Sequence, residues 1–136
     1  NAKEGDCLFV GIIDMDGLKY INDTFGHTEG DSGISRICAA AKTVMQKHEI
    51  CIRAGGDEFY IMGIGQYEAA DVEARILAFQ AAMDKENQKI EKPYLLSASM
   101  GCAIAPVNEE LRVDCVIDEA DELMYRNKVA RKRQRV

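Results

Sequence analysis

The sequence predicts an α/β domain of the α+β type: a ferredoxin-like or palm-type sheet, mixed and mainly antiparallel, flanked by helices. Apolar runs short enough for strands alternate with longer segments of helical periodicity in the order β-α-α-β-β-α-β-α, which contains the split βαβ pattern. The 136 residues, 47% of them hydrophobic, suffice for one core, and no repeat or linker divides them. We therefore expect a single domain over 1–136, with its helices packed on one face of the sheet.

The first elements are predicted from periodicity and from residues that end helices. The apolar run over 7–14 is typical of a strand, and a short helix over 19–26 is expected to end at Gly26. Asp31 is a suitable N-cap for a longer helix to about residue 47, because apolar residues recur there at helical spacing.

The rest of the chain predicts a hairpin, two more helices and a last strand. Two short β-type runs, 50–53 and 59–62, flank Gly55-Gly56, and this hairpin signature places Asp57 near the tip. The later elements, delimited by periodicity and by Pro93, are a helix over 68–89, a strand over 95–105 and a helix over 114–132.

The charge distribution argues against a nucleic-acid-binding protein. The net charge is −6, yet residues 126–136 carry six basic residues and no acid, which leaves −12 for the remainder. The strongly negative charge of the residues before 126 would repel the phosphate backbone of a nucleic acid. The basic end is either a solvated last turn of helix or a set of cations that reach a triphosphate.

The sequence also bears on the cellular compartment. No apolar stretch approaches the roughly 20 residues of a membrane span, and the first residues do not resemble a secretion signal. We therefore expect a cytoplasmic domain without direct membrane contact. Its five cysteines are scattered and odd in number, which favours buried reduced thiols over a disulfide framework or a zinc site.

Two acidic clusters end two of the predicted strands. Asp14 follows the first apolar run, and Asp57-Glu58 follow the glycine pair of the hairpin. A hard divalent cation such as Mg²⁺ (or Mn²⁺) takes oxygen ligands and borrows only one or two protein carboxylates when phosphates complete its shell. Asp14 and Asp57 would suffice for nucleotidyl transfer, although Gly-Gly-Asp alone is also typical of an ordinary tight turn.

Several motifs in a fixed order make the interpretation more specific. They are Asp14-Met15-Asp16-Gly17-Leu18-Lys19-Tyr20-Ile21-Asn22-Asp23-Thr24-Phe25-Gly26-His27, Gly30-Asp31, Arg53-Ala54-Gly55-Gly56-Asp57-Glu58-Phe59, Ser99-Met100-Gly101 and Ala120-Asp121-Glu122-Leu123-Met124-Tyr125-Arg126-Asn127-Lys128. Over nearly the whole chain, this series resembles the signature of the GGDEF-domain diguanylate cyclases. The resemblance implies an enzyme that condenses two GTP into cyclic di-GMP with release of two pyrophosphates. It also implies that the site forms between two copies of the domain, each holding one GTP.

The same resemblance implies which residues bind metal. Asp14 and Asp57 would bind Mg²⁺ through their carboxylates and Met15 through its carbonyl, while Glu58 would assist at a second ion. Asp57 is also the family's candidate for the base that deprotonates the ribose 3′-hydroxyl, although the roles of base and ligand compete for the same oxygens.

The nucleotide contacts are implied in the same way. Asn22 and Asp31 would recognise guanine, because a carboxylate accepts from the guanine N–H groups and an amide both donates and accepts. The backbone at Gly17 and Leu18 would hold phosphates, and Lys19 would stabilise charge in the transition state. The expected contacts to the outer phosphates are Lys128 and Lys132.

Three departures from the family pattern are present. The closing Lys-x-x-Gly-Arg is here Lys128-Val129-Ala130-Arg131-Lys132, so that a lysine replaces the arginine at the last phosphate contact. The inhibitory Arg-x-x-Asp motif falls on Gln46-Lys47-His48-Glu49, which predicts weak or absent product feedback. The leading Asp-x-Leu-Thr-type helix and turn is also missing, so we expect part of a longer protein with an upstream sensory or regulatory domain.

Two other functions stay open on the sequence. A noncatalytic nucleotide-binding signalling module would keep this fold, and a different palm-type nucleotidyl transferase or cyclase would keep the strand-end and hairpin acids. Intact Asp14, Asp57 and Lys19 favour an enzyme over the module, and Asn22 with Asp31 favours guanine over another base.

Overall fold

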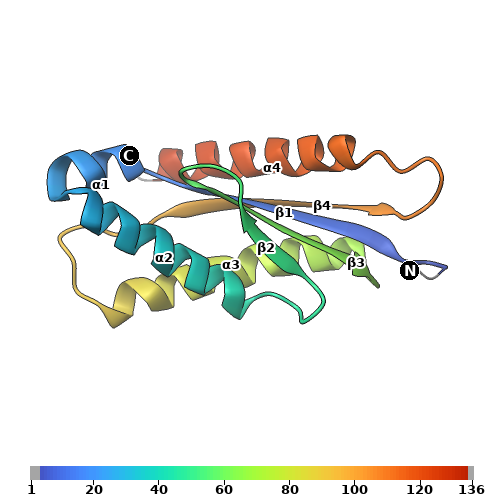
Figure 1. The fold of residues 1–136 in the computed structure, drawn as a ribbon, viewed down its shortest axis with the longest axis horizontal. Helices are drawn as coiled ribbons and strands as arrows, with labels where there is room; N and C mark the ends of the chain where they lie inside the picture. Colours follow the sequence, from blue (N-terminus) through green and yellow to red (C-terminus); the bar gives the residue numbers. More distant parts are fainter. Residues whose placement is uncertain (1–3, 135–136) are drawn as a thin grey trace.

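The computed structural model describes residues 4–134, and for residues 132–134 only the course of the backbone. The sheet has the strand order β2-β3-β1-β4, with every neighbouring pair antiparallel, as Figure 1 shows. This arrangement confirms the α+β class and the predicted order of elements, although the described sheet is antiparallel throughout and not mixed. Along the chain they are β1 (Cys7–Met15), α1 (Leu18–Phe25), α2 (His27–Thr43), β2 (Ile50–Arg53), β3 (Glu58–Gly65), α3 (Ala69–Lys89), β4 (Ala98–Pro106) and α4 (Val113–Gln134).

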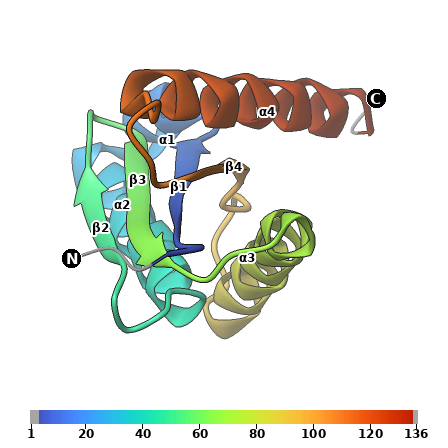
Figure 2. The same cartoon turned by 90° about the vertical axis from the view of Figure 1, so that its right-hand side faces the viewer.

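The alternation of side chains along β1 divides the core between the two faces of the sheet. Phe9 and Ile13 pack with α1, α2 and α3 on one face, whereas Val10 and Ile12 pack under α4 on the other. Figure 2 shows α4 on the opposite side of the sheet from α2 and α3. The expectation that all helices pack on one face is therefore wrong, because β1 is apolar on both faces and each face is covered. Within residues 4–134, no helix is both long and apolar enough to cross a membrane.

The helix α4 lies directly against β4 at a glycine. A Cβ atom on Gly101 would come within 2.1 Å of the backbone nitrogen of Met124 and 2.2 Å of the carbonyl oxygen of Ala120. Only glycine therefore permits this approach. The contact brings the second half of α4, which carries Lys128 and Arg131, beside the adjoining ends of β1 and β4.

The first two helices are separated by a single residue. Gly26 has a φ of 96°, a conformation that favours glycine, and α2 follows it at once from His27. The expectation that Asp31 caps the helix is therefore wrong, because the N-cap of α2 is Gly26, five residues earlier. Asp31 instead lies exposed within the first turns of α2, which ends at Thr43.

All five cysteines are free thiols, as the sequence predicts. Cys102 is buried, and burial raises the pKa of its thiol to about 12. Cys7, Cys38 and Cys51 are half-buried and Cys115 is exposed on α4, so the expectation of burial is confirmed for Cys102 alone.

Candidate active site

The end of β1 and the β2–β3 hairpin bring the predicted acids together. Asp14 lies directly opposite Glu58 in the β1–β3 ladder. Both belong to the alternating set of side chains that faces α4. The Met15 N–H donates to the carbonyl oxygen of Asp57 at 2.8 Å, which joins the bend of the hairpin to the end of β1. Like charges directly opposite each other in a sheet repel, so this arrangement favours a nearby cation.

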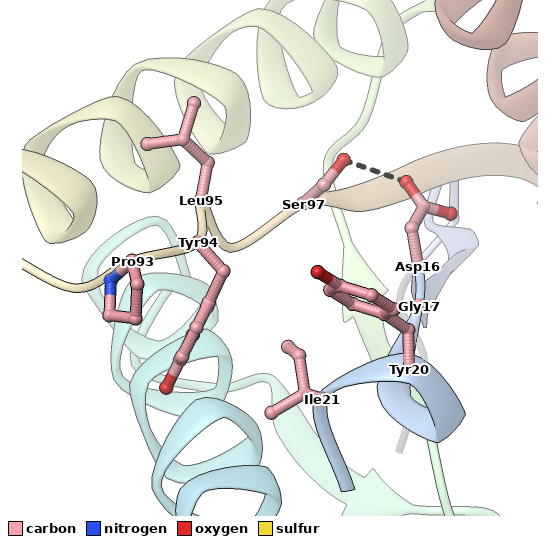
Figure 3. Close-up of a pocket in the computed structure, with 8 residues that line it drawn as sticks. All are labelled: Asp16, Gly17, Tyr20, Ile21, Pro93, Tyr94, Leu95 and Ser97. Carbon is pink, nitrogen blue, oxygen red and sulfur yellow. Dashed lines mark hydrogen bonds between the residues drawn. The ribbon is translucent and has the colours of Figure 1, made fainter. Parts of the chain in front are cut away.

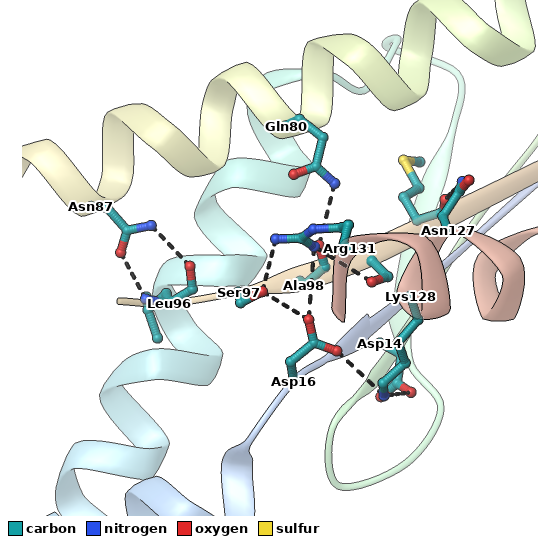
Figure 4. Close-up of polar contacts among 12 residues, drawn as sticks. Asp14, Asp16, Gln80, Asn87, Leu96, Ser97, Ala98, Asn127, Lys128 and Arg131 are labelled. Atoms are coloured by element: carbon teal, nitrogen blue, oxygen red, sulfur yellow. Dashed lines mark hydrogen bonds and ion pairs between the residues drawn. The ribbon is translucent and has the colours of Figure 1, made fainter. Parts of the chain in front are cut away.

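Lys128 on α4 supplies such a cation. Its Nζ lies 2.8 Å from Oδ2 of Asp14 and 3.4 Å from Oδ1 of Asp16 (Figure 4). Burial alone would lower the pKa of Lys128, but the hydrogen bond to Asp14 and the two negative charges outweigh it and raise that pKa. The pKa of Asp14 is raised: burial is the largest cause, the hydrogen bond and charge of Lys128 act in the opposite direction, and the charges of Asp57 and Asp16 add to the rise.

The second oxygen of Asp14 fits a metal ligand. Its Oδ1 is buried and has no hydrogen-bond partner among the described residues. The described part of the chain holds no group of three or more His, Cys, Asp or Glu residues that would form a complete cage. Mg²⁺ needs only one or two carboxylates when water and phosphates complete its octahedron, so Asp14 with Asp57 meets its requirement. Met15 and Glu58, also predicted as ligands, are their neighbours in the chain.

The bend of the hairpin is held by Arg53 and leaves open space beside its glycines. Arg53 donates from Nε to the carbonyl of Gly55 at 3.1 Å and from Nη2 to that of Gly56 at 2.6 Å. Neither glycine has a left-handed φ, and a Cβ on Gly56 would meet nothing within 4 Å. Neither the conformation of the turn nor packing within the chain therefore requires glycine at these two positions.

The residues predicted to recognise the nucleotide lie on α1 and α2. Asn22 packs directly against α2, since a Cβ on Gly30 would lie 1.7 Å from its Oδ1, and Asp31 is the next residue along α2. Gly17, with a φ of 70°, precedes α1, and no side chain caps the N–H groups of the first turn, which begins at Leu18. Such uncapped N–H groups are available to an anion.

Lys19, predicted to stabilise charge in the transition state, is not brought to the acids. The side chain of Lys19 is 92% exposed, and its Nζ lies 3.9 Å from Asp23, one turn along α1. Lys132 lies on α4, but its side chain is outside the described residues.

An open pocket of about 570 Å³ adjoins this site between α1 and the segment 93–97 (Figure 3). Its polar end contains Asp16, Gly17 and Ser97, and the Ser97 hydroxyl donates to Oδ2 of Asp16 at 2.8 Å. Asn22 and Asp31 do not line it, so the predicted guanine-binding residues lie outside this pocket. Its apolar walls are formed by Tyr20, Ile21, Pro93, Tyr94 and Leu95.

The sequence interpretation missed three polar residues of the site. Arg53 holds the bend, while Ser97 and Arg131 contact Asp16. Arg131 had a detectable signal, because it follows Lys128 by three residues and so shares its side of α4. Ser97 had none, because it precedes β4 in an irregular segment.

Known proteins resemble this chain over most of its length. The family model described as "Diguanylate cyclase, GGDEF domain" matches residues 1–134. The probable diguanylate cyclase DgcJ of Escherichia coli is 34% identical over 129 residues, which are 93% of this chain and 24% of DgcJ. Diguanylate cyclase DgcP of the same species is 31% identical over 130 residues, covering 89% of this chain and 35% of DgcP.

A solved structure shows the same fold. The GGDEF domain of DgcB from Caulobacter crescentus, in complex with c-di-GMP, superposes with a TM-score of 0.77 at 22% identity. The match covers 93% of this chain and 74% of that one. In contrast, the chain spans only about a quarter to a third of the two curated relatives.

Proposed function

Since this chain belongs to the GGDEF-domain family of diguanylate cyclases, we propose that it condenses two GTP molecules into cyclic di-GMP with release of two pyrophosphates. The reaction depends on Mg²⁺ or Mn²⁺ and takes place where two copies of the domain, each holding one GTP, face each other. Because the chain matches only part of each curated relative, the whole protein is expected to add a sensory or regulatory domain.

The observation that supports this proposal best is the junction between β1 and the hairpin. Asp14 keeps a buried oxygen without a partner, beside a bend whose two glycines are required by neither its conformation nor its packing. A missing Cβ at an open bend allows close approach of a molecule from outside the chain. A triphosphate next to strand-end carboxylates would use both features.

The metal would be held by the carboxylates of Asp14 and Asp57 and the carbonyl of Met15, with Glu58 at a second ion. When bound, it would neutralise charge on the phosphates and lower the pKa of the attacking hydroxyl. The ammonium group of Lys128 pairs with Asp14 in this structure. In the complex with GTP it would leave Asp14 and pair with the outer phosphates of the nucleotide. The N–H groups at the start of α1 would donate to phosphate oxygens.

The remaining residues select and activate the nucleotide. Asn22 and Asp31, on facing parts of α1 and α2, would hydrogen-bond the guanine edge. Asp57, next to the open bend, would accept the proton of the ribose 3′-hydroxyl, after which that oxygen attacks the α-phosphorus of the other GTP and pyrophosphate leaves. Lys19, exposed on α1, is free to reach the charge that develops in the transition state.

The decisive experiment uses the domain tethered as a dimer and incubated with GTP and Mg²⁺, with the products identified by mass. Cyclic di-GMP and two equivalents of pyrophosphate are expected. GTP binding without turnover would favour the noncatalytic module instead. A different cyclic or linear nucleotide product would favour another palm-type nucleotidyl transferase.

A further inference from the structure

Arg131 reaches from α4 across the start of β4. Its Nη2 donates to Oγ of Ser97 at 2.8 Å, and its Nη1 donates to the carbonyl of Ala98 and lies 3.4 Å from Oγ of Ser99. The same Nη1 lies 3.7 Å from Oδ2 of Asp16. Figure 4 shows this guanidinium beside the start of β4, with dashed lines to Ser97 and to the carboxylate of Asp16.

Arg131 contacts Ser97 and Ala98, the residues that join β4 to the end of β1. The Asp16 N–H donates to the carbonyl of Ser97 at 2.8 Å, and the Ser97 hydroxyl returns a bond of 2.8 Å to the Asp16 carboxylate. In the β1–β4 ladder, Met15 lies opposite Ala98 and Asp14 lies opposite Ser99. Arg131 therefore braces the strand that positions both expected metal ligands at the end of β1.

Two acids and two cations meet at this junction. The acids Asp14 and Asp16 face the cations Lys128 and Arg131, and Lys128 contacts both acids. If Lys128 leaves to bind a triphosphate, Asp16 keeps Arg131 as its counterion. Without Arg131, Asp16 would have only Lys128 as a counterion among the described cations, and each step that removes Lys128 would leave a half-buried negative charge without a counterion.

We propose that Arg131 is a positioning residue that holds Asp16 and the start of β4, so that Lys128 is released from the acids to the nucleotide. This inference rests on the proposed function, because it assumes that Lys128 contacts the phosphates. The family motif gives no role at this position, since Arg131 stands where the motif has glycine. It is this chain's arginine, on a helix that continues to Gln134, that makes the arrangement.

The test measures binding of a non-hydrolysable GTP analogue with Mg²⁺ by calorimetry. Arg131→Gln should weaken binding about tenfold, the usual scale for losing a hydrogen bond to a charged group. Arg126→Gln is the matched control, because Arg126 lies on the same helix, is 70% exposed and pairs only with Glu122 in the described structure. Its binding should stay within about twofold of the wild type.

A double-mutant cycle separates this role from a merely structural one. In a Lys128→Met background, Arg131→Gln should cause little further loss, because the effect passes through Lys128. An equal loss in both backgrounds, or wild-type binding by Arg131→Gln, overturns the inference. If Arg131→Gln fails to fold, Ser97→Ala takes its place, because it removes the hydroxyl that contacts both Arg131 and Asp16. Ser97→Ala should also weaken binding of the analogue. Unchanged binding would again overturn the inference.

The binding experiment also separates failure of the proposed function from failure of the role inferred for Arg131. If the wild type binds the analogue but forms no cyclic product from GTP, the proposed function fails, and the role of Arg131 is still decided by the binding ratios. If the wild type does not bind the analogue at all, both fail together.

Discussion

The carboxylate of Glu49 is completely buried and accepts a hydrogen bond from each terminal nitrogen of Arg75, both at 2.8 Å. Its oxygens also accept from the Tyr67 hydroxyl at 2.5 Å and from the Gln46 N–H at 2.9 Å. The guanidinium lies 4.4 Å from the centroid of the Phe9 ring. This satisfied network ties α3 to the loop before β2, and it occupies the position at which the family's inhibitory acid stands.

The first prediction is that Glu49 makes the fold sensitive to acid. Burial alone would raise the pKa of Glu49, but the hydrogen bonds from Arg75, Tyr67 and the Gln46 N–H, together with the charge of Arg75, outweigh it and hold that pKa below its ordinary value. The resulting stability is present above the unfolded pKa and is lost as pH falls through the lower folded pKa. Glu49→Gln should cost about 3–5 kcal/mol of unfolding free energy at neutral pH, because Arg75 is left buried and unpaired. Denaturant unfolding between about pH 3 and pH 7 would measure both effects.

The control for this prediction replaces both partners. Glu49→Leu combined with Arg75→Met removes both charges and should recover most of the lost stability, because apolar pairs of similar volume often equal a buried ion pair. If Glu49→Gln instead unfolds with wild-type free energy and wild-type pH dependence, the ion pair contributes nothing measurable.

The second prediction concerns the metal ligands. Asp14→Asn and Asp57→Asn should each abolish formation of cyclic di-GMP while the domain stays folded, because each change removes an anionic oxygen and keeps the side-chain shape. Product formation and Mn²⁺ binding would be measured together, with Asp84→Asn on the exposed side of α3 as the control. Wild-type turnover in either site variant would remove the assignment.

The third prediction concerns the choice of base. Asp31→Ala should weaken GTP binding by about 1–3 kcal/mol and leave ATP binding nearly unchanged, because only guanine would lose a partner for its N–H groups. Calorimetric titration with both nucleotides would show this. Asp23→Ala serves as the control, since Asp23 is exposed on α1 beside Lys19. An equal loss for both nucleotides would mean that Asp31 does not read the base.

The fourth prediction is that product does not inhibit this domain through the Arg-x-x-Asp position. Gln46 is exposed and lacks the guanidinium fork, while Glu49 is buried and fully bonded to Arg75. Progress curves should therefore be unaffected by added cyclic di-GMP. Gln46→Arg should not restore inhibition either, because the acid remains inaccessible. Noncompetitive inhibition that appears in Gln46→Arg would show that Glu49 can leave Arg75.

The sequence predicts those parts of the fold that depend on local patterns. The run over 7–14 and the hairpin about Gly55-Gly56 lie where alternation and turn residues put them, and α3 agrees with its predicted range to within a residue. The side of the sheet that α4 covers was not predictable in this way. The uninterrupted apolar run of β1 indicates that both faces are covered, but which helix covers which face depends on the space that Gly101 leaves, a property of the assembled sheet.

The same limit applies to the candidate site. Asp14 and Asp57 follow from the motif, and the hydrogen bond from Met15 to Asp57 shows why the two are neighbours. The pairing of Glu49 with Arg75 could not be predicted from the sequence. Arg75 is 26 positions away, on a helix whose position against the sheet is set by packing. The role of Asp31 as a helix cap was wrong for a local reason, the left-handed turn at Gly26.

The absence of a side chain at Gly101 has a consequence for variants far from the acids. Any larger residue there would push α4 away from β4, since its Cβ would overlap the backbone at Ala120 and Met124. Lys128 and Arg131 would move with the helix, although neither touches position 101. A substitution at this buried glycine should therefore have the same effect on nucleotide binding as the loss of both cationic side chains. A screen for inactive variants would group it with the variants that bind nucleotide poorly.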